Sequence, residues 1–150
     1  MNLTKTSLKP VAEYAGFWRR LGALVIDSLL LYIAGLLIFS KLFLPLILIK
    51  KLIPFGVNRF FLSYFVLGWV YYALMESSSQ QATLGKIALG IMVTDLSGNR
   101  ISFARASGRH FTKILSGIIL YIGFIMAGFT EKKQALHDII ADCLVVKKQK

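Results

Sequence analysis

The sequence predicts an all-α membrane protein with about three transmembrane helices, a small extramembrane hairpin and an amphipathic C-terminal helix. Hydrophobic residues make up 56% of the 150 residues, and the mean hydropathy is +0.65. Soluble proteins contain roughly 45–50% apolar residues, so lipid is the simplest explanation of the excess. Because no linker rich in serine, glycine or proline interrupts the sequence, we expect one membrane domain over residues 1–150.

The positive charge is distributed as in a membrane protein. The formal net charge is +11, which in a soluble protein would suggest a nucleic-acid partner. Here Lys and Arg stand between the apolar stretches rather than along one face, a distribution that anchors helix ends to headgroups and anionic lipids. We therefore expect the lipid bilayer as the partner, and no nucleic acid.

The first membrane helix is predicted at about residues 20–43. Just before it, residues 17–20 combine two aromatic side chains with two arginines, as at a membrane interface. Between residues 21 and 49 only Asp27 and Lys41 are charged, and at about 1.5 Å per residue this stretch exceeds the roughly 30 Å hydrocarbon layer. Pro45 favours a helix end nearby, so residues 44–58 are interpreted as an interfacial connection. The apolar stretch is too long for a secretory signal, and we expect it to remain as an anchor.

A second membrane helix is predicted at about residues 60–77, where the chain is charge-free as far as residue 75 and rich in aromatic side chains. After it, Ile91–Thr94 is strand-like, Ser97–Asn99 signals a turn, and residues 101–103 alternate weakly. This pattern predicts a small extramembrane hairpin around residues 91–103. Since exposed strand edges are unfavourable, we expect the hairpin to lie near the tail and to pair with residues 143–146.

A third membrane segment is predicted at about residues 112–130, and its path has two alternatives. Three full crossings would place nine Lys and Arg residues on each side of the membrane, which gives no orientation by the positive-inside rule. If the segment instead bends at Gly117, Gly123 or Gly128 and returns, one side holds fourteen and the other four. That kinked or re-entrant path predicts that both termini are cytoplasmic.

Apolar side chains in the tail follow helical spacing, at Leu136, Ile139, Ile140, Cys143 and Leu144. Polar residues occupy the other positions, which predicts a short amphipathic helix lying on the membrane. The pair His137-Asp138 could suggest a metal or catalytic site, but a metal site needs three or four ligands and the chain holds two histidines and one cysteine. We interpret Asp138 or Gln134 as a cap or tether of the tail helix.

Asp27 is the most informative residue, because a carboxylate two turns inside an apolar helix costs roughly 3 kcal/mol. It follows Arg20 by seven residues, or about 10.5 Å along a helix axis, which is too far for a direct ion pair. We predict that Asp27 is buried in the bundle beside a basic group or a polar cavity. It is either an ion or proton ligand, or it locks helices together by pairing with Lys86, Arg105 or Arg109.

Three separated motifs resemble the RDD family of membrane proteins. They are residues 14–27 (YAGFWRRLGALVID), Thr83-Leu-Gly-Lys86 followed by residues 90–98, and Gln134-Ala-Leu-His-Asp138. The arginine and two aspartates that name the family fall on Arg20, Asp27 and Asp138. The resemblance implies a small multi-spanning protein, and we expect it in the bacterial cytoplasmic membrane with its N-terminus in the cytoplasm. Where the family commonly has Ala-Gly-Thr, this chain has Ala141-Asp142-Cys143, which argues against close backbone packing at that point.

Two classes of function remain open. The first is transport of an ion or small solute by a homo-oligomer, since three short helices enclose little of a pathway; sodium/proton exchange is implied by the resemblance alone. The second is a non-transporting assembly or scaffold protein. We find no Ser/His/Asp set, phosphate-binding glycine loop or paired carboxylate site, so we expect no enzyme, cofactor or metal. The candidate residues for function or helix locking are Arg20, Asp27, Lys86, Arg109, His137 and Asp138.

Overall fold

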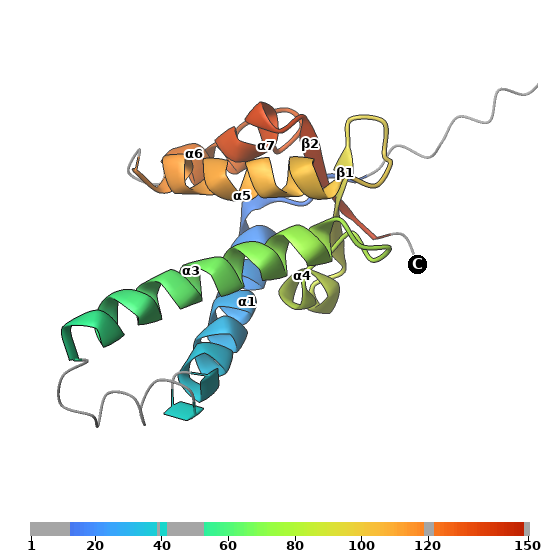
Figure 1. Ribbon diagram of the computed structural model, residues 1–150. Helices are drawn as coiled ribbons and strands as arrows, with labels where there is room; N and C mark the ends of the chain where they lie inside the picture. Colours follow the sequence, from blue (N-terminus) through green and yellow to red (C-terminus); the bar gives the residue numbers. More distant parts are fainter. Residues whose placement is uncertain (1–12, 39, 42–52, 119–121, 149–150) are drawn as a thin grey trace, which may run out of the picture.

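The computed structural model describes residues 13–38, 40–41, 53–118 and 122–148. Two long helices, α1 (Phe17–Ile38) and α3 (Ile53–Glu76), contact each other, and the remaining elements gather around one end of this pair (Figure 1). These elements are α4 (Leu84–Ala88), β1 (Ile91–Asp95), α5 (Phe103–Ile118), α6 (Ile122–Ile125), the 3-10 turn η2 (Met126–Gly128), α7 (Leu136–Ile140) and β2 (Cys143–Lys147). Helix α5 packs along α3, and α4 packs against α1.

Helix α1 has the length and the surface of a membrane helix. Its buried stripe is narrow and consists of every fourth residue: Ala23, Asp27, Leu31 and Gly35. The other faces are apolar and exposed, as at Val25, which is 60% exposed. Within the described ranges, α1 is the one helix long and apolar enough to cross a bilayer, with a mean hydropathy of 2.3 over an 18-residue window. The helix predicted at 20–43 is therefore present, and residues 39, 42 and 43 of that prediction lie outside the described ranges.

Helix α3 begins earlier than predicted. It starts at Ile53, so residues 53–58 of the predicted connection are helical, while residues 44–52 lie outside the described ranges. Pro54 is compatible with this helix because it stands in the first turn, where backbone N–H groups have no helical acceptor. The helix ends at Glu76, where two serine hydroxyls satisfy carbonyl oxygens of its last turn. The Ser77 hydroxyl donates to the Ala73 carbonyl oxygen at 2.7 Å, and the Ser78 hydroxyl donates to that of Met75 at 2.7 Å.

The two strands form an antiparallel pair between distant parts of the chain. The pairing runs from Ile91 opposite Lys147 to Asp95 opposite Cys143, which confirms the predicted pairing with the tail. The prediction of a local hairpin over residues 91–103 was wrong in its second half, because residues 101–103 form no strand and Phe103 begins α5. The turn after β1 is present: the Asp95 carboxylate accepts from two backbone N–H groups, those of residues 97 and 99.

The segment predicted at 112–130 is bent. Helix α5 ends at Ile118, and α6 begins at Ile122. A Cβ placed on Gly123 would lie 2.9 Å from the Cβ of Ser116, whereas residues seven apart in one helix are separated by about 10.5 Å along its axis. The chain therefore folds back on itself between these residues, as the glycine-based alternative predicted, and the glycine permits the close approach.

The tail helix is shorter than predicted. Helix α7 covers only Leu136–Ile140, and Cys143 and Leu144 belong to β2. The chain leaves the helix at Asp142, whose φ is 49°, in the left-handed region that often ends helices and favours glycine. This is the position at which the family that the chain resembles commonly has glycine. The family's glycine at this position is therefore explained by the left-handed backbone conformation rather than by a close contact.

Replacing Asp142 with glycine is expected to raise the free energy of unfolding by up to about 1 kcal/mol, since glycine removes the steric cost of positive φ. Asp142 is exposed, so little else changes. Thermal unfolding of the purified protein in neutral detergent measures the effect. The control is Asp142→Ala, which keeps the steric cost and should be no more stable than the original chain. Equal stability of the glycine and alanine variants would contradict the explanation.

Candidate functional site

Asp27 lies in a pocket of neutral hydrogen-bond donors. Its carboxylate is buried, with the residue 1% exposed. Oδ1 accepts from the Tyr71 hydroxyl at 2.8 Å and from the Gly85 backbone N–H at 2.7 Å, and Oδ2 accepts from the Thr83 hydroxyl at 2.6 Å. The predicted burial is confirmed. Of the two alternatives for Asp27, the structure does not show the ion pair with Lys86, Arg105 or Arg109: within the described residues, three neutral donors from α3 and the start of α4 contact the carboxylate.

The sequence Thr83-Leu-Gly-Lys86 docks α4 against α1. Thr83 is the N-cap of α4, and its hydroxyl oxygen accepts from the Lys86 backbone N–H at 3.4 Å while its proton points to Asp27. Gly85 lies so close to α1 that a Cβ there would overlap the Ala23 carbonyl oxygen. A residue without a side chain is therefore required at this contact. The motif that contributed to the resemblance thus holds Asp27 and α4 in register.

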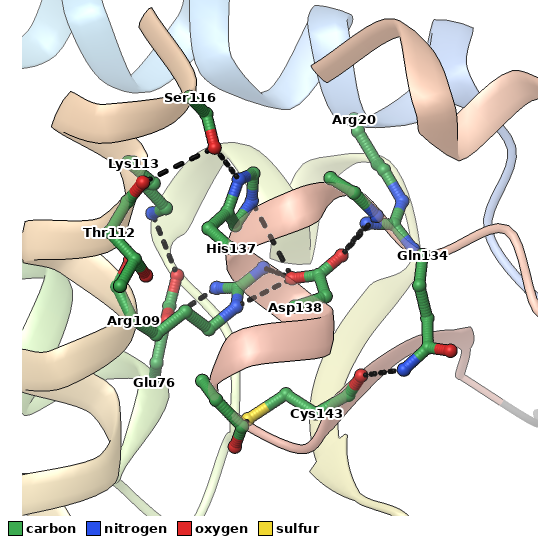
Figure 2. Close-up of polar contacts among 12 residues, drawn as sticks. Arg20, Glu76, Arg109, Thr112, Lys113, Ser116, Gln134, His137, Asp138 and Cys143 are labelled. Carbon is green, nitrogen blue, oxygen red and sulfur yellow. Dashed lines mark hydrogen bonds and ion pairs between the residues drawn. The ribbon is translucent and has the colours of Figure 1, made fainter. Parts of the chain in front are cut away.

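A second group of polar residues forms what we call the charged network: Arg20, Glu76, Lys86, Arg109, Lys113 and Asp138. Figure 2 labels all of these residues except Lys86. Arg109 lies at its centre, between two carboxylates. Its Nη1 donates to Glu76 Oε2 at 2.6 Å, and its Nε donates to Asp138 Oδ1 at 2.8 Å. Arg109 of α5 thereby joins the end of α3 to α7.

The remaining members of the charged network attach to those two carboxylates. Arg20 pairs with Oδ2 of Asp138. Lys86 Nζ lies 2.5 Å from Glu76 Oε1, and Lys113 Nζ lies 3.4 Å from the same atom. Both carboxylate residues are at most 1% exposed, and buried charges of this kind require partners. The charged network therefore connects five elements, α1, α3, α4, α5 and α7.

Asp138 also caps the tail helix, as predicted. Its Oδ2 accepts from the Ala135 backbone N–H at 3.1 Å, and the Gln134 side-chain amide donates to the Cys143 carbonyl oxygen at 2.9 Å. Burial by itself raises the pKa of the Asp138 carboxyl, but Arg109 and Arg20 outweigh that effect and hold the pKa below its ordinary value. Asp138 is therefore an anion at neutral pH.

His137 and Lys86 are shifted toward their neutral forms. Burial lowers the pKa of His137 to about 3, and its Nδ1 lies 3.3 Å from the Ser116 hydroxyl oxygen. Burial also lowers the pKa of Lys86 to about 7, although Glu76 beside it opposes the shift. In the described part of the chain, no three His, Cys, Asp or Glu side chains gather closely enough to hold a metal ion. The pKa of Lys86 therefore lies near neutral pH.

A cavity of about 350 Å³ lies against the charged network, within the usual size range of roughly 300–1,000 Å³ for small-molecule sites. Most of its wall is apolar. The structure brings all six predicted residues together here. Five of them line the cavity, and Asp138 holds two of the five from behind. The lining residues are Phe17, Arg20, Leu21, Leu24, Asp27, Tyr72, Lys86, Arg109, Lys113, Ile125, Ala135, His137 and Val145.

Sequence reasoning missed Glu76 and Lys113. Glu76 follows a charge-free stretch, and an acidic residue in such a place carries the same signal as Asp27: a charge that must find a partner. Lys113 carries no local signal, because basic residues at helix ends are common in membrane proteins. Tyr71 was also missed, since its role depends on the position of α1.

Comparisons with known proteins show the family to which the chain belongs. The RDD family model matches residues 14–142. The chain is 37% identical over 148 residues to "Uncharacterized protein YxaI" of Bacillus subtilis (strain 168), covering 89% of this chain and 97% of the relative. It is 33% identical over 139 residues to "Uncharacterized membrane protein YteJ" of the same organism, covering 89% of this chain and 80% of the relative. No solved structure gives a significant match. The chain belongs to the RDD family.

Proposed function

We propose that the protein is integral to the bacterial cytoplasmic membrane, with α1 and α3 crossing the bilayer and both termini in the cytoplasm. The apolar exposed surface of α1 supports the crossing, and one bacterial relative is named a membrane protein. The isolated bridge between Tyr14 and Val146 brings the two ends of the described chain together, so both lie on one side. Because α5 and α6 fold back, they add no crossing, and the basic residues gather on that same side.

A cysteine introduced at Lys148 in the Cys143→Ser background tests this topology. Lys148 is exposed, whereas Cys143 is buried. We expect a membrane-impermeant maleimide to label position 148 only when the cytoplasmic face is accessible, as in inside-out vesicles. Labelling from the outer face of sealed cells would contradict the arrangement.

Within this membrane domain, the cavity binds an anionic solute, and this binding is the first step of transport. The observation that carries the proposal is the surplus of basic residues at the cavity. Four basic residues line it, Arg20, Lys86, Arg109 and Lys113, against three acidic residues: Asp27 in the lining, and Glu76 and Asp138 as ion-pair partners. A bound anion would also raise the pKa of Lys86 from about 7 and so increase the fraction of this side chain that is charged at neutral pH.

The same geometry weighs against a sodium ion at these carboxylates. Asp27 already accepts from three donors, and Glu76 and Asp138 are engaged by basic side chains. Sodium binds through oxygen ligands and would have to displace several of these donors. The sodium/proton exchange implied by the resemblance therefore has less support here than anion binding.

The alternative is a non-transporting assembly protein. One observation favours it: every carboxylate at the site is held by side chains or backbone of other elements, which is what helix locking requires. In that case the basic side chains serve the fold alone, and no solute competes for them.

Isothermal titration of the purified protein in neutral detergent separates these possibilities. Phosphate, acetate and octyl phosphate are compared with sodium chloride and octyl trimethylammonium chloride. We expect one of the anionic probes to bind, and Lys113→Gln to weaken that binding by about 10–100-fold, the effect of losing a hydrogen bond to a charged group. The matched control is Arg105→Gln, on the exposed side of the same helix.

The outcomes differ for each hypothesis. Sodium binding that is lost in Asp27→Asn would favour cation exchange and contradict the proposal. No ion binding at all would favour the assembly protein. If an anion binds, its uptake into liposomes that contain the protein is compared with its uptake into protein-free liposomes. Equal rates would show that the protein binds the anion without transporting it.

A further inference from the structure

We propose that the anion is amphipathic, with an oxyanion headgroup on an apolar chain, and that it enters the cavity sideways from the bilayer. This inference rests on the proposed anion-binding function and adds the chemical class of the ligand. It commits to a phosphate or carboxylate headgroup held by the basic side chains and an acyl chain held by the apolar wall.

The cavity changes from apolar to charged with depth. At its outer edge, three apolar lining residues are partly exposed: Leu21 at 36%, Leu24 at 37% and Ile125 at 45%. Deeper lining residues are charged and buried, with Lys86 at 7% and Arg109 at 2%. Two of the three outer residues belong to α1, whose exposed apolar faces suit lipid. The cavity therefore has an apolar opening toward the hydrocarbon and basic side chains at its inner end. An anionic lipid has the matching arrangement, an apolar chain that ends in a negative headgroup.

The apolar wall of the cavity favours an amphiphile over a small inorganic anion. A small inorganic anion is strongly hydrated, and moving it along a mostly apolar wall without hydrogen bonds is costly. An acyl chain is accommodated along the apolar wall as well as it is in lipid, because both environments keep its apolar surface away from water. Among the described lining residues, the charged donors Lys86 and Arg109 are buried, so the headgroup is the part of the ligand that has to reach them.

Tyr72 supplies an independent indication of a ligand. It lines the cavity and is 7% exposed, and its hydroxyl has no hydrogen-bond partner among the described residues. A buried hydroxyl without a partner is rare because it costs free energy. The Lys113 ammonium lies 4.1 Å from the centre of the Tyr72 ring, so the hydroxyl and this cation belong to one neighbourhood. A headgroup oxyanion would accept from both groups.

Chain length and wall substitutions test the inference. We compare binding of inorganic phosphate, butyl phosphate, octyl phosphate and dodecyl phosphate, with dodecanol as the neutral control, to the full chain in neutral detergent. Affinity is expected to rise with chain length by at least tenfold from phosphate to dodecyl phosphate, because each buried CH₂ adds affinity, and dodecanol is expected to bind at least tenfold more weakly than dodecyl phosphate.

Two tryptophan substitutions on α1 form a matched pair. Leu24→Trp fills the apolar edge of the cavity and is expected to weaken dodecyl phosphate binding at least tenfold. Val25→Trp adds the same side chain on the outward face, where Val25 is 60% exposed, and should leave binding unchanged. Tyr72→Phe, which removes only the hydroxyl, should weaken the phosphate series by several-fold and serves if Leu24→Trp does not fold.

The results distinguish this inference from the function on which it rests. If inorganic phosphate binds as tightly as dodecyl phosphate and Leu24→Trp has no effect, the amphiphile is wrong while anion binding stands. If neither the phosphate series nor acetate binds, or if binding does not depend on Lys113, the proposed function fails as well. Equal binding of dodecanol would show an apolar site without headgroup recognition and would overturn the inference.

Discussion

Replacing Arg109 with glutamine is expected to lower the free energy of unfolding by about 3–5 kcal/mol, the usual cost of breaking a buried ion pair by removing one partner. The guanidinium reaches Glu76 with Nη1 and Asp138 with Nε and Nη2, and a glutamine amide is too short to bridge both carboxylates. Chemical denaturation of the purified protein in neutral detergent measures the loss.

Two further variants locate the effect. Arg105→Gln removes a basic residue from the exposed side of the same helix and should change stability by less than about 0.5 kcal/mol. Arg109→Lys retains the charge but cannot form the planar double contact, so its stability should lie between that of the original chain and that of Arg109→Gln. If Arg109→Gln cost less than about 1 kcal/mol, Arg20, Lys86 and Lys113 would suffice to neutralise the two carboxylates.

The burial of Asp27 could be predicted because the reason is local. A carboxylate in a long apolar stretch must leave the lipid-facing side of its helix, and the structure places it on the one buried stripe of α1. The identity of its partners could not be predicted. Tyr71 and Thr83 lie 44 and 56 residues away, and neutral hydroxyls satisfy a carboxylate as well as the basic residues that we considered.

The two errors in the smaller elements also have physical causes. Apolar residues at 136, 139, 140, 143 and 144 fit a helix, but over so few residues a helix and a buried strand cannot be separated by spacing. The left-handed backbone at Asp142 separates them. Similarly, residues 101–103 alternate like a strand, yet the Ser102 hydroxyl accepts from the Arg105 N–H at 3.2 Å and helps to begin α5.

The charged network could be predicted only in part. Arg20 and Asp138 were candidates through the family resemblance, and Lys86 and Arg109 were candidates as basic partners for the charge of Asp27. Their common location depends on the fold-back between α5 and α6 and on the β1–β2 pairing, which together bring the tail to the start of α1. Distances along the sequence give no measure of these contacts. A polar cavity beside Asp27 was one predicted possibility, but its mostly apolar wall and its other lining residues could not be predicted.

Replacing Gly85 with alanine is expected to lower the free energy of unfolding by about 1–3 kcal/mol, the range for overpacking a tight contact. The new Cβ would lie 2.9 Å from Cγ of Asp27 and would overlap the Ala23 carbonyl oxygen. The backbone oxygen has no rotamer by which to move away, so α4 must shift from α1. That shift lengthens the hydrogen bonds from Gly85 and Thr83 to Asp27.

The matched control is Gly108→Ala, in the interior of α5, where a Cβ would meet no atom within 4 Å. Alanine is the better helix former, so this variant should gain about 0.5–1 kcal/mol. Opposite signs for the two glycine substitutions, measured by the same denaturation, would assign the loss at Gly85 to the contact with α1 rather than to alanine itself.

A double variant, Gly85→Ala with Asp27→Ser, separates the overlap with Asp27 from the overlap with Ala23. The shorter serine side chain relieves the overlap at position 27 but leaves the Ala23 oxygen in place. Partial rescue is expected, with a coupling of about 0.5–3 kcal/mol, whereas strict additivity would show that Gly85 and Asp27 do not act together.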